Sequence, residues 1–424
     1  MSKASLNAPD MPRPAPAWRA AASLLADAAF RRAWSTGVIV GTVRWLEFLA
    51  ISLYVLHETG SAFLVAFFIF LRMLPVALLG AVAGAAAERF SPRRLLLVLL
   101  ALGVATSVAQ AMLAIAGMLQ LWQVAAGVLM NGLLWAVDLP LRRTMMGEIA
   151  GTQRIAAAMA LDTATNNATR MLGPGLGGLL LQTSGIHGAF LLGSVLYALA
   201  FGLVLGLRLA DRAEHAGGFR LLTHLLEGFR IIGRDRSLTG TLTVTVIFNT
   251  LAWPTTAMVP VIGEHYLGLA AFPIGLLVSA DGLGALIGAI AVVVAARPRH
   301  YRAIYLHGVA LYALGAMLFA FCPWPFVSGF LLIAMGAGNA CFASMQATIV
   351  FLTAPPTARP RVMGVLAVCI GSSALGFVQI GVLSSLVGAQ VATILSSVAA
   401  IVALAVAMAI WPEIRSGARP PAGA

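Results

Sequence analysis

The chain has 424 residues, of which 60% are hydrophobic and only 10% are charged, with a formal net charge of +12. A soluble chain carries about a quarter charged residues, so the composition excludes an ordinary soluble protein. The cations lie between long apolar runs, so the charge indicates membrane topology and does not indicate nucleic-acid binding.

Twelve mainly apolar stretches follow one another along the chain. Nearly all have the roughly 20 residues that a helix needs to cross a bilayer. They lack the period-two alternation of barrel strands, so only helices can satisfy the backbone there. The sequence therefore predicts an all-α integral membrane protein with twelve transmembrane helices in two pseudo-symmetric six-helix bundles. The predicted spans are residues 33–56, 61–86, 95–118, 121–141, 156–182, 188–208, 239–262, 271–296, 302–321, 324–349, 362–387 and 390–411.

Basic residues follow a strict pattern along these spans. Of the 27 Lys and Arg residues, only Arg44, Arg72 and Arg170 lie inside spans. The others lie in the terminal segments and in alternate loops, and the intervening loops contain no Lys or Arg. By the positive-inside rule, both termini are cytoplasmic. The first 30 residues show no cleavable signal peptide, so we expect the first span to direct insertion into the inner (plasma) membrane of a bacterium.

The longest predicted cytoplasmic connection divides the spans six and six. Within it, residues 219–232 carry Leu222, Leu225, Leu226 and Phe229 on one face, which predicts an amphipathic helix on the membrane surface. Duplicated bundles of this kind bind solutes between the halves and work by alternating access. The expected divisions are a cytoplasmic segment 1–32, a first bundle 33–208, a linker 209–238, a second bundle 239–411 and a cytoplasmic tail 412–424.

Two motifs resemble those of the major facilitator superfamily. The loop after the second span resembles the G-x-x-x-D-R-x-G-R-R signature of that family, with Glu88 in place of Asp, and its matching residues are Gly84, Glu88, Arg89, Arg93 and Arg94. The fifth span resembles the end of the family's G-P-x-x-G-G antiporter motif, at Gly173, Pro174, Gly177 and Gly178, with Thr169 in place of an upstream glycine.

The resemblance implies the fold of that family and a secondary active transporter. It implies that the loop after the second span is a gate. The sequence around both motifs is most similar to the enterobactin-exporter and macrolide-efflux branch, which implies proton-coupled efflux, by antiport, of multidrug or siderophore type.

The fifth span carries one continuous stripe. Asp162, Asn166, Arg170, Pro174 and Gly178 are each four residues apart, so they share one face of a helix. Its polar half must avoid lipid, because an unpaired charge in hydrocarbon costs at least a few kcal/mol. We expect this half to line a cavity, the helix to bend at Pro174, and the glycines to pack closely on a neighbouring helix.

Three acidic residues in the spans are candidates for proton coupling: Glu47, Asp281 and Asp138. A carboxylate is costly in a membrane, which favours a functional role. Arg44 lies three residues before Glu47, so the alternative is an ion pair that only stabilises the bundle. Arg44, Arg72 and Arg170 keep their charge and would act as counter-ions or as contacts for an anion.

Amide and aromatic side chains in the spans predict a cavity for small amphiphilic compounds. Tryptophan in a span is also common in plain packing, so each assignment has that alternative. The candidates are Trp45, Asn131, Trp135, Asn166, Asn249, Trp253, Asn339, Gln346 and Gln379.

Other functions remain open from the sequence. A carrier of lipids, lysolipids or metabolites, or an uptake system, would use the same fold. A membrane enzyme is disfavoured, because the sequence contains no HExxH, HxxxxD or GxSxG motif. The sequence also contains no P-loop motif for binding ATP, so ATP is not expected to be the direct energy source. We expect a monomer whose partners are a small-molecule substrate, protons and membrane lipids, without a metal or other cofactor.

The orientation yields the first testable prediction. Single cysteines placed at Thr59, Gly185 and Gly268 should react from outside with a membrane-impermeant thiol reagent, because their loops lack Lys and Arg. Cysteines at Ser91, Gly217 and Thr357 should react only after the membrane is opened. The reverse labelling pattern would contradict the orientation.

Overall fold

The computed structural model describes residues 17–89, 91–207 and 221–415, and every regular element in these ranges is helical. Side chains are described there except at residues 17, 18, 79–89, 221–225 and 295. Within these ranges, 10 helical segments are long and apolar enough to cross a membrane, and Ala62–Leu78 is a shorter apolar helix. One of the 10 segments contains two crossings, so the predicted all-helical fold with twelve crossings is confirmed.

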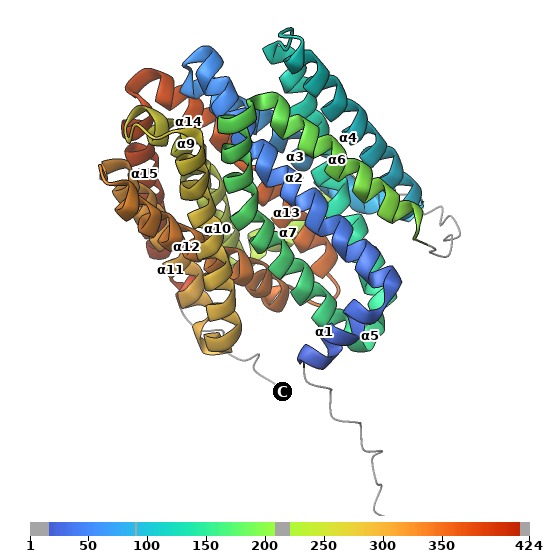
Figure 1. Ribbon diagram of the computed structural model, residues 1–424. Helices are drawn as coiled ribbons and strands as arrows, with labels where there is room; N and C mark the ends of the chain where they lie inside the picture. The colour runs from blue at the N-terminus through green and yellow to red at the C-terminus, as the bar shows by residue number, and fades with distance from the viewer. Residues whose placement is uncertain (1–16, 90, 208–220, 416–424) are drawn as a thin grey trace, which may run out of the picture.

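The first half consists of one short helix and six crossings (Figure 1). The fourth and fifth crossings form one element, α5. The bounds are α1 (Ala17–Ala26), α2 (Ala28–Thr59), α3 (Ala62–Arg89), α4 (Pro92–Ile115), α5 (Leu121–Ser184) and α6 (Ile186–Leu205).

The second half begins after the connecting helix α7 (Leu221–Arg234). Its first crossing is irregular: a π-helical turn and a 3₁₀ turn lie between α8 and α9 and place Trp253 at the junction. Such turns are frequent at functional sites. The bounds are α8 (Arg236–Ile247), η1 (Phe248–Ala252), η2 (Trp253–Ala257), α9 (Met258–His265), α10 (Ala271–Ala295), η3 (Pro298–His300), α11 (Tyr301–Phe321), α12 (Pro325–Thr353), α13 (Arg359–Gly371), α14 (Ser373–Val387), α15 (Ala389–Ile410) and η4 (Pro412–Ile414).

Helix α5 is interrupted at Gly151 and not at Pro174. Gly151 has φ 68° and ψ 171°, a conformation that only glycine adopts without strain, and it lies in the predicted basic turn between two crossings. The backbone stays helical through Pro174, where the sequence predicts a bend. Gly173 and Gly177 pack closely on the backbone of α2 near Leu46, and this contact holds the helix in place.

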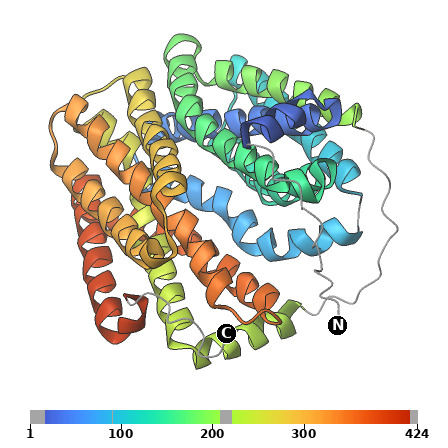
Figure 2. The same cartoon turned by 90° about the horizontal axis from the view of Figure 1, so that it is seen from below.

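Two groups of helices stand side by side, blue to green and yellow to red (Figures 1 and 2). Their main contacts pair α5 with α10, α3 with α13 and α14, and α2 with α9. Gly178 meets the carbonyl of Ala271, and Gly282 meets the backbone of Arg170, so the α5–α10 contact is backbone to backbone. On α5, Gly175 and Gly178 therefore face α10, whereas Gly177 packs within its own half.

Two polar contacts join the halves at one end of the molecule. That end carries the loops without Lys or Arg, and we call it the Lys/Arg-free end; the opposite end is the basic end. At the Lys/Arg-free end, His57 Nε2 of α2 lies 2.9 Å from Glu264 Oε2 of α9. Phe272 donates its backbone N–H to Gln182 Oε1 at 3.0 Å, again across the halves. The two halves are thus joined at this end.

Helix α7 corresponds to the amphipathic helix predicted at residues 219–232. Its side chains Leu226 and Phe229 are exposed, as the prediction of a membrane-facing stripe requires. On another face, Glu227 Oε2 pairs with Arg361 Nε of α13 at 3.0 Å, and Gly228 packs on the Arg361 carbonyl. The helix is therefore attached to the second half.

Candidate functional site

A chain of buried ion pairs crosses the first half. Arg44 Nη2 lies 3.4 Å from Asp138 Oδ2, and Arg142 Nε lies 3.4 Å from the other oxygen of Asp138. Arg142 also pairs with Asp162, whose second oxygen accepts from Arg143 Nε at 2.8 Å. The predicted proton-coupling candidate Asp138 is thus shared by two arginines.

Glu47 has no cation within ion-pair distance among the described residues. Its Oε2 accepts a hydrogen bond from Asn131 Nδ2 at 2.8 Å, and its Oε1 lies 3.4 Å from the Ser107 hydroxyl. Asn131 also donates to the Tyr197 hydroxyl at 3.1 Å. The alternative ion pair between Arg44 and Glu47 is wrong, because Arg44 points across to α5 and binds Asp138 instead.

One ion pair connects the two halves inside the protein. Arg170 of α5 pairs with Asp281 of α10, and both side chains are largely buried. In the amide orientation that matches its neighbours, the side-chain oxygen of Asn339 accepts a hydrogen bond from Arg170 Nη1 at 2.6 Å. The guanidinium also lies 5.4 Å from the ring centroid of Trp45, within the range of a cation–π contact. Arg170, Asp281 and Asn339, three predicted site residues, are brought together here.

The predicted tryptophans line a central cavity between the halves. Trp45, Trp135 and Trp253 all line this cavity, which has a volume of about 20 Å³. An adjoining cavity of about 210 Å³ shares Trp135, Trp253 and Met73 with it. The complete lining of the smaller cavity is Arg44, Trp45, Phe48, Ile69, Arg72, Met73, Trp135, Arg170, Trp253, Thr256 and Phe377. The sequence did not single out Phe48 and Phe377, since a span contains many equivalent phenylalanines.

The remaining amide candidates lie elsewhere. Asn131 binds Glu47 inside the first half, and Asn249 donates back to the Thr245 carbonyl of its own helix at 2.9 Å. Gln379 contacts Ser396 within the second half, Gln346 is buried, and Asn166 is partly buried on α5. Among the described amide candidates, Asn339 has a hydrogen bond to a residue that lines the central cavity, Arg170.

The loop after the second crossing is described in part. Gly84, Glu88 and Arg89 lie in helix α3, but their side chains are outside the described residues. Arg93 donates to the carbonyls of Val204 and Leu205, at 3.3 and 2.8 Å, at the C-terminal end of α6. A cation there complements the helix dipole and satisfies free carbonyl groups. Arg94 lies beside it in the first turn of α4.

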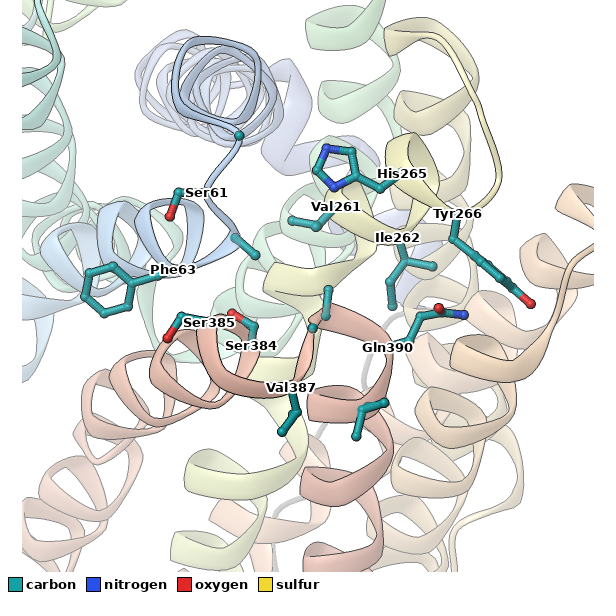
Figure 3. A pocket seen from close by; sticks show the side chains of 15 residues that line it. Ser61, Phe63, Val261, Ile262, His265, Tyr266, Ser384, Ser385, Val387 and Gln390 are labelled. Carbon is teal, nitrogen blue, oxygen red and sulfur yellow. The ribbon is translucent and has the colours of Figure 1, made fainter.

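A larger pocket of about 540 Å³ opens at the Lys/Arg-free end (Figure 3). It lies between the start of α3, the end of α9 and the turn from α14 to α15. Side chains of Ser61, His265, Ser384 and Gln390 border it. None of the buried ion pairs borders this pocket, so the central cavity is the better candidate for the solute site. The described residues contain no cluster of three potential metal ligands.

Twelve apolar crossings in two halves, with buried charges and a cavity between them, define a membrane transport protein of the duplicated-bundle class. The family model of the Major Facilitator Superfamily matches residues 33–374, well over half of the chain. The chain therefore belongs to the major facilitator superfamily, and it is a multi-pass transport protein and not an enzyme.

Known relatives agree with this assignment. The chain is 27% identical over 183 residues to YfiS, an uncharacterized MFS-type transporter of Bacillus subtilis (strain 168); the match covers 42% of this chain and 43% of that one. The nucleoside transporter NupG shares the fold, with a TM-score of 0.71 at 14% identity, over 89% of this chain and 98% of that one. A bacterial homologue of the lysosomal transporter Spinster, in an inward-facing, unoccupied conformation, gives 0.69 at 13%, covering 95% and 99%.

The ion pair between the halves gives the second testable prediction. Asp281→Asn leaves Arg170 buried without a counter-ion, which we expect to destabilise the protein by about 3 kcal/mol. Thermal unfolding in detergent measures the loss as a lower Tm. The double variant Arg170→Gln with Asp281→Asn should recover most of it, because no charge is then unpaired.

The exposed pair Arg236–Glu413, at 2.7 Å, provides a matched control. Glu413→Gln should leave Tm unchanged, since water screens a pair of this kind. Equal melting temperatures for wild type and Asp281→Asn would contradict the pairing.

Proposed function

We propose that this chain is a proton-coupled secondary transporter that moves small amphiphilic, aromatic solutes by alternating access. Glu47 is the observation that carries the proposal. It is a buried carboxylate held by Asn131 and Ser107, two partners without charge, so it can lose or gain a proton without breaking an ion pair. Asp138 and Asp281 are each held by arginine, which makes them the second choices.

Contacts between the halves support alternating access. The contacts His57–Glu264 and Gln182–Phe272 join the halves at the Lys/Arg-free end, which the positive-inside rule assigns to the outside. The structure then corresponds to a state that is closed outside, with both termini cytoplasmic in the inner membrane of a bacterium. Opening outward requires α5 to separate from α10 and α3 from α14. Arg93 holds α4 to α6 within one half, as a member of the proposed cytoplasmic gate.

The cavity lining supports an aromatic solute. Trp45, Trp135 and Trp253 offer ring faces from both halves, and Thr256 is the only uncharged polar side chain in the lining of the smaller cavity. Drug-like and siderophore-like compounds have this character, in agreement with the resemblance to the enterobactin-exporter and macrolide-efflux branch. Lipid, lysolipid or metabolite transport is the alternative, and the protein acts as a monomer in either case.

The direction of transport depends on the charge of the solute. Export in exchange for protons, predicted from the fifth-span motif, requires that solute and proton compete, as a cation and the proton of Glu47 would. An anion would instead bind together with the proton, and both would move in the same direction. Moving one elementary charge across 100 mV is worth about 2.3 kcal/mol, which is sufficient to drive either mode.

Replacement of Glu47 tests the proposal. Glu47→Gln keeps the size and the hydrogen-bonding groups of the side chain but cannot titrate, so it should abolish transport driven by a proton gradient. The assay uses proteoliposomes with an imposed gradient and a panel of dyes, macrolides and catecholate siderophores. We expect the initial rate to fall by at least about tenfold, as for loss of an essential proton carrier, while solute binding remains and loses its pH dependence.

Glu58→Gln is the matched control, because Glu58 lies on the same helix, α2, but is exposed at its end. It should transport at the wild-type rate. If Glu47→Gln transports normally and Asp281→Asn or Asp138→Asn does not, the coupling role belongs to that residue. Normal gradient-driven transport in all three variants would refute proton coupling through these carboxylates.

A further inference from the structure

Arg72 is a buried cation without a counter-ion. It lies on α3, is 4% exposed, and lines the central cavity. One of its N–H groups donates to the Arg44 carbonyl, and its guanidinium lies over Trp135, 5.6 Å from the ring centroid. Among the described residues, no carboxylate lies within ion-pair distance of it. A buried charge in this condition is costly unless a ligand completes its environment.

The other two arginines of the cavity differ in this respect. Arg44 is neutralised by Asp138 and Arg170 by Asp281, and neither acid lines the cavity. The remaining buried acid of this region, Glu47, acts on Arg72 only from beyond ion-pair distance. The cavity therefore presents three cations and no carboxylate, and one of the cations is uncompensated.

Unpaired hydrogen-bond donors point to the same kind of ligand. Arg72 Nε and Trp45 Nε1 are both buried, and neither has an acceptor among the described residues. Both atoms can only donate. Buried polar groups in proteins are nearly always paired, so two free donors at one cavity indicate a ligand that brings acceptors. A carboxylate has two oxygens and no donor, and it satisfies this requirement.

We infer that the central cavity and the adjoining cavity of about 210 Å³ together bind an aromatic monoanion, with its carboxylate or an equivalent acidic group on Arg72 and its ring beside Trp135 and Trp253, which line both. This inference rests on the proposed function and specifies its substrate class. Charge-assisted hydrogen bonds to arginine are the strong ones, and they give direction to an otherwise apolar site.

The charge of Glu47 then determines how the anion and the proton are coupled. The groups that face Glu47 are Ser107 of α4, Asn131 of α5, Tyr197 of α6 and, from beyond ion-pair distance, Arg72 of α3. An ionised Glu47 offsets part of the charge of Arg72 from beyond ion-pair distance and repels a bound anion. When Glu47 is protonated, it carries no negative charge, and the charge of Arg72 is available to pair with the anionic ligand. Proton and anion therefore bind cooperatively, and by linkage they travel in the same direction.

Three compounds of nearly equal shape test the charge preference: 2-naphthoate, 2-naphthamide and protonated 2-naphthylmethylamine. Equilibrium dialysis of the radiolabelled compounds against the purified full-length protein in nanodiscs measures binding. We expect 2-naphthoate to bind at least about tenfold more tightly than the amide and the amine, as a charge-assisted contact predicts. Its affinity should rise as the pH falls from 8 to 6, and this rise should be absent in Glu47→Gln.

Variants of Arg72 assign the preference to this residue. Arg72→Gln should bring the affinity for 2-naphthoate down to that for 2-naphthamide, and Arg72→Lys should keep part of the difference. Arg72→Gln should melt at or above the wild-type Tm, because it removes an uncompensated charge. Arg299→Gln is the matched control; Arg299 is exposed and distant from the cavity lining, and this variant should bind like wild type.

Several results would overturn the inference: no binding of 2-naphthoate, equal binding of the three compounds, or a preference for the amine. A lower Tm of Arg72→Gln together with lost binding of the amide would mean that Arg72 is structural, and would overturn it too. Failure of the proposed function looks different. In that case 2-naphthoate is preferred, but Glu47→Gln leaves gradient-driven transport intact.

Discussion

A charge inside a bilayer needs a partner, and this constraint organises the whole interior of the protein. In the first half, Asp138 and Asp162 hold Arg44, Arg142 and Arg143 in one connected series. Between the halves, Asp281 holds Arg170. Arg44–Asp138 joins α2 to α5 and Arg170–Asp281 joins α5 to α10, because an unpaired member would be costly in this environment. Among the described residues near the central cavity, Glu47 and Arg72 have no such pair, and these two carry the proposed chemistry.

The pair between the halves also connects the conformational change to charge. Opening the Lys/Arg-free end requires α5 to leave α10, where Gly282 packs on the backbone of Arg170. Arg170 keeps its contact with Trp45 of its own half, whereas Asp281 would lose its only cationic partner. A proton is the simplest replacement for that partner. The same geometry that closes the cavity therefore makes Asp281 the second candidate for proton uptake, after Glu47.

The sequence predicts the crossings well, because hydropathy over about 20 residues reports directly on the membrane. It also identifies Arg170, Asp281 and the three tryptophans as candidate site residues within the spans. It cannot choose partners among helices that lie at the same depth. Arg44 and Glu47 are neighbours on one helix and were the natural pair, but the packing of α2 on α5 offers Arg44 an acid in another crossing.

For a related reason, the sequence does not predict which neighbouring helix each glycine of α5 contacts. Gly177 and Gly178 are adjacent in one motif, yet one faces α2 and the other faces α10, a difference set by how α5 is rotated. The backbone stays helical through Pro174, where a bend is predicted. The absence of a counter-ion for Arg72 depends on every neighbouring helix at once, so only the complete fold shows it.

Transport by alternating access requires the two halves to separate between α5 and α10. Gly175 N donates to Ser279 Oγ at 3.1 Å across this contact, and a Cβ at Gly175 would lie 3.4 Å from that oxygen. Cysteines at both positions, in a chain whose Cys322, Cys341 and Cys369 are replaced by alanine, are close enough for a disulfide. Oxidation of the two cysteines to a disulfide should stop transport in proteoliposomes, and reduction should restore it. Each single-cysteine variant should transport normally under both conditions. Undiminished transport by the fully cross-linked protein would contradict this separation of α5 from α10.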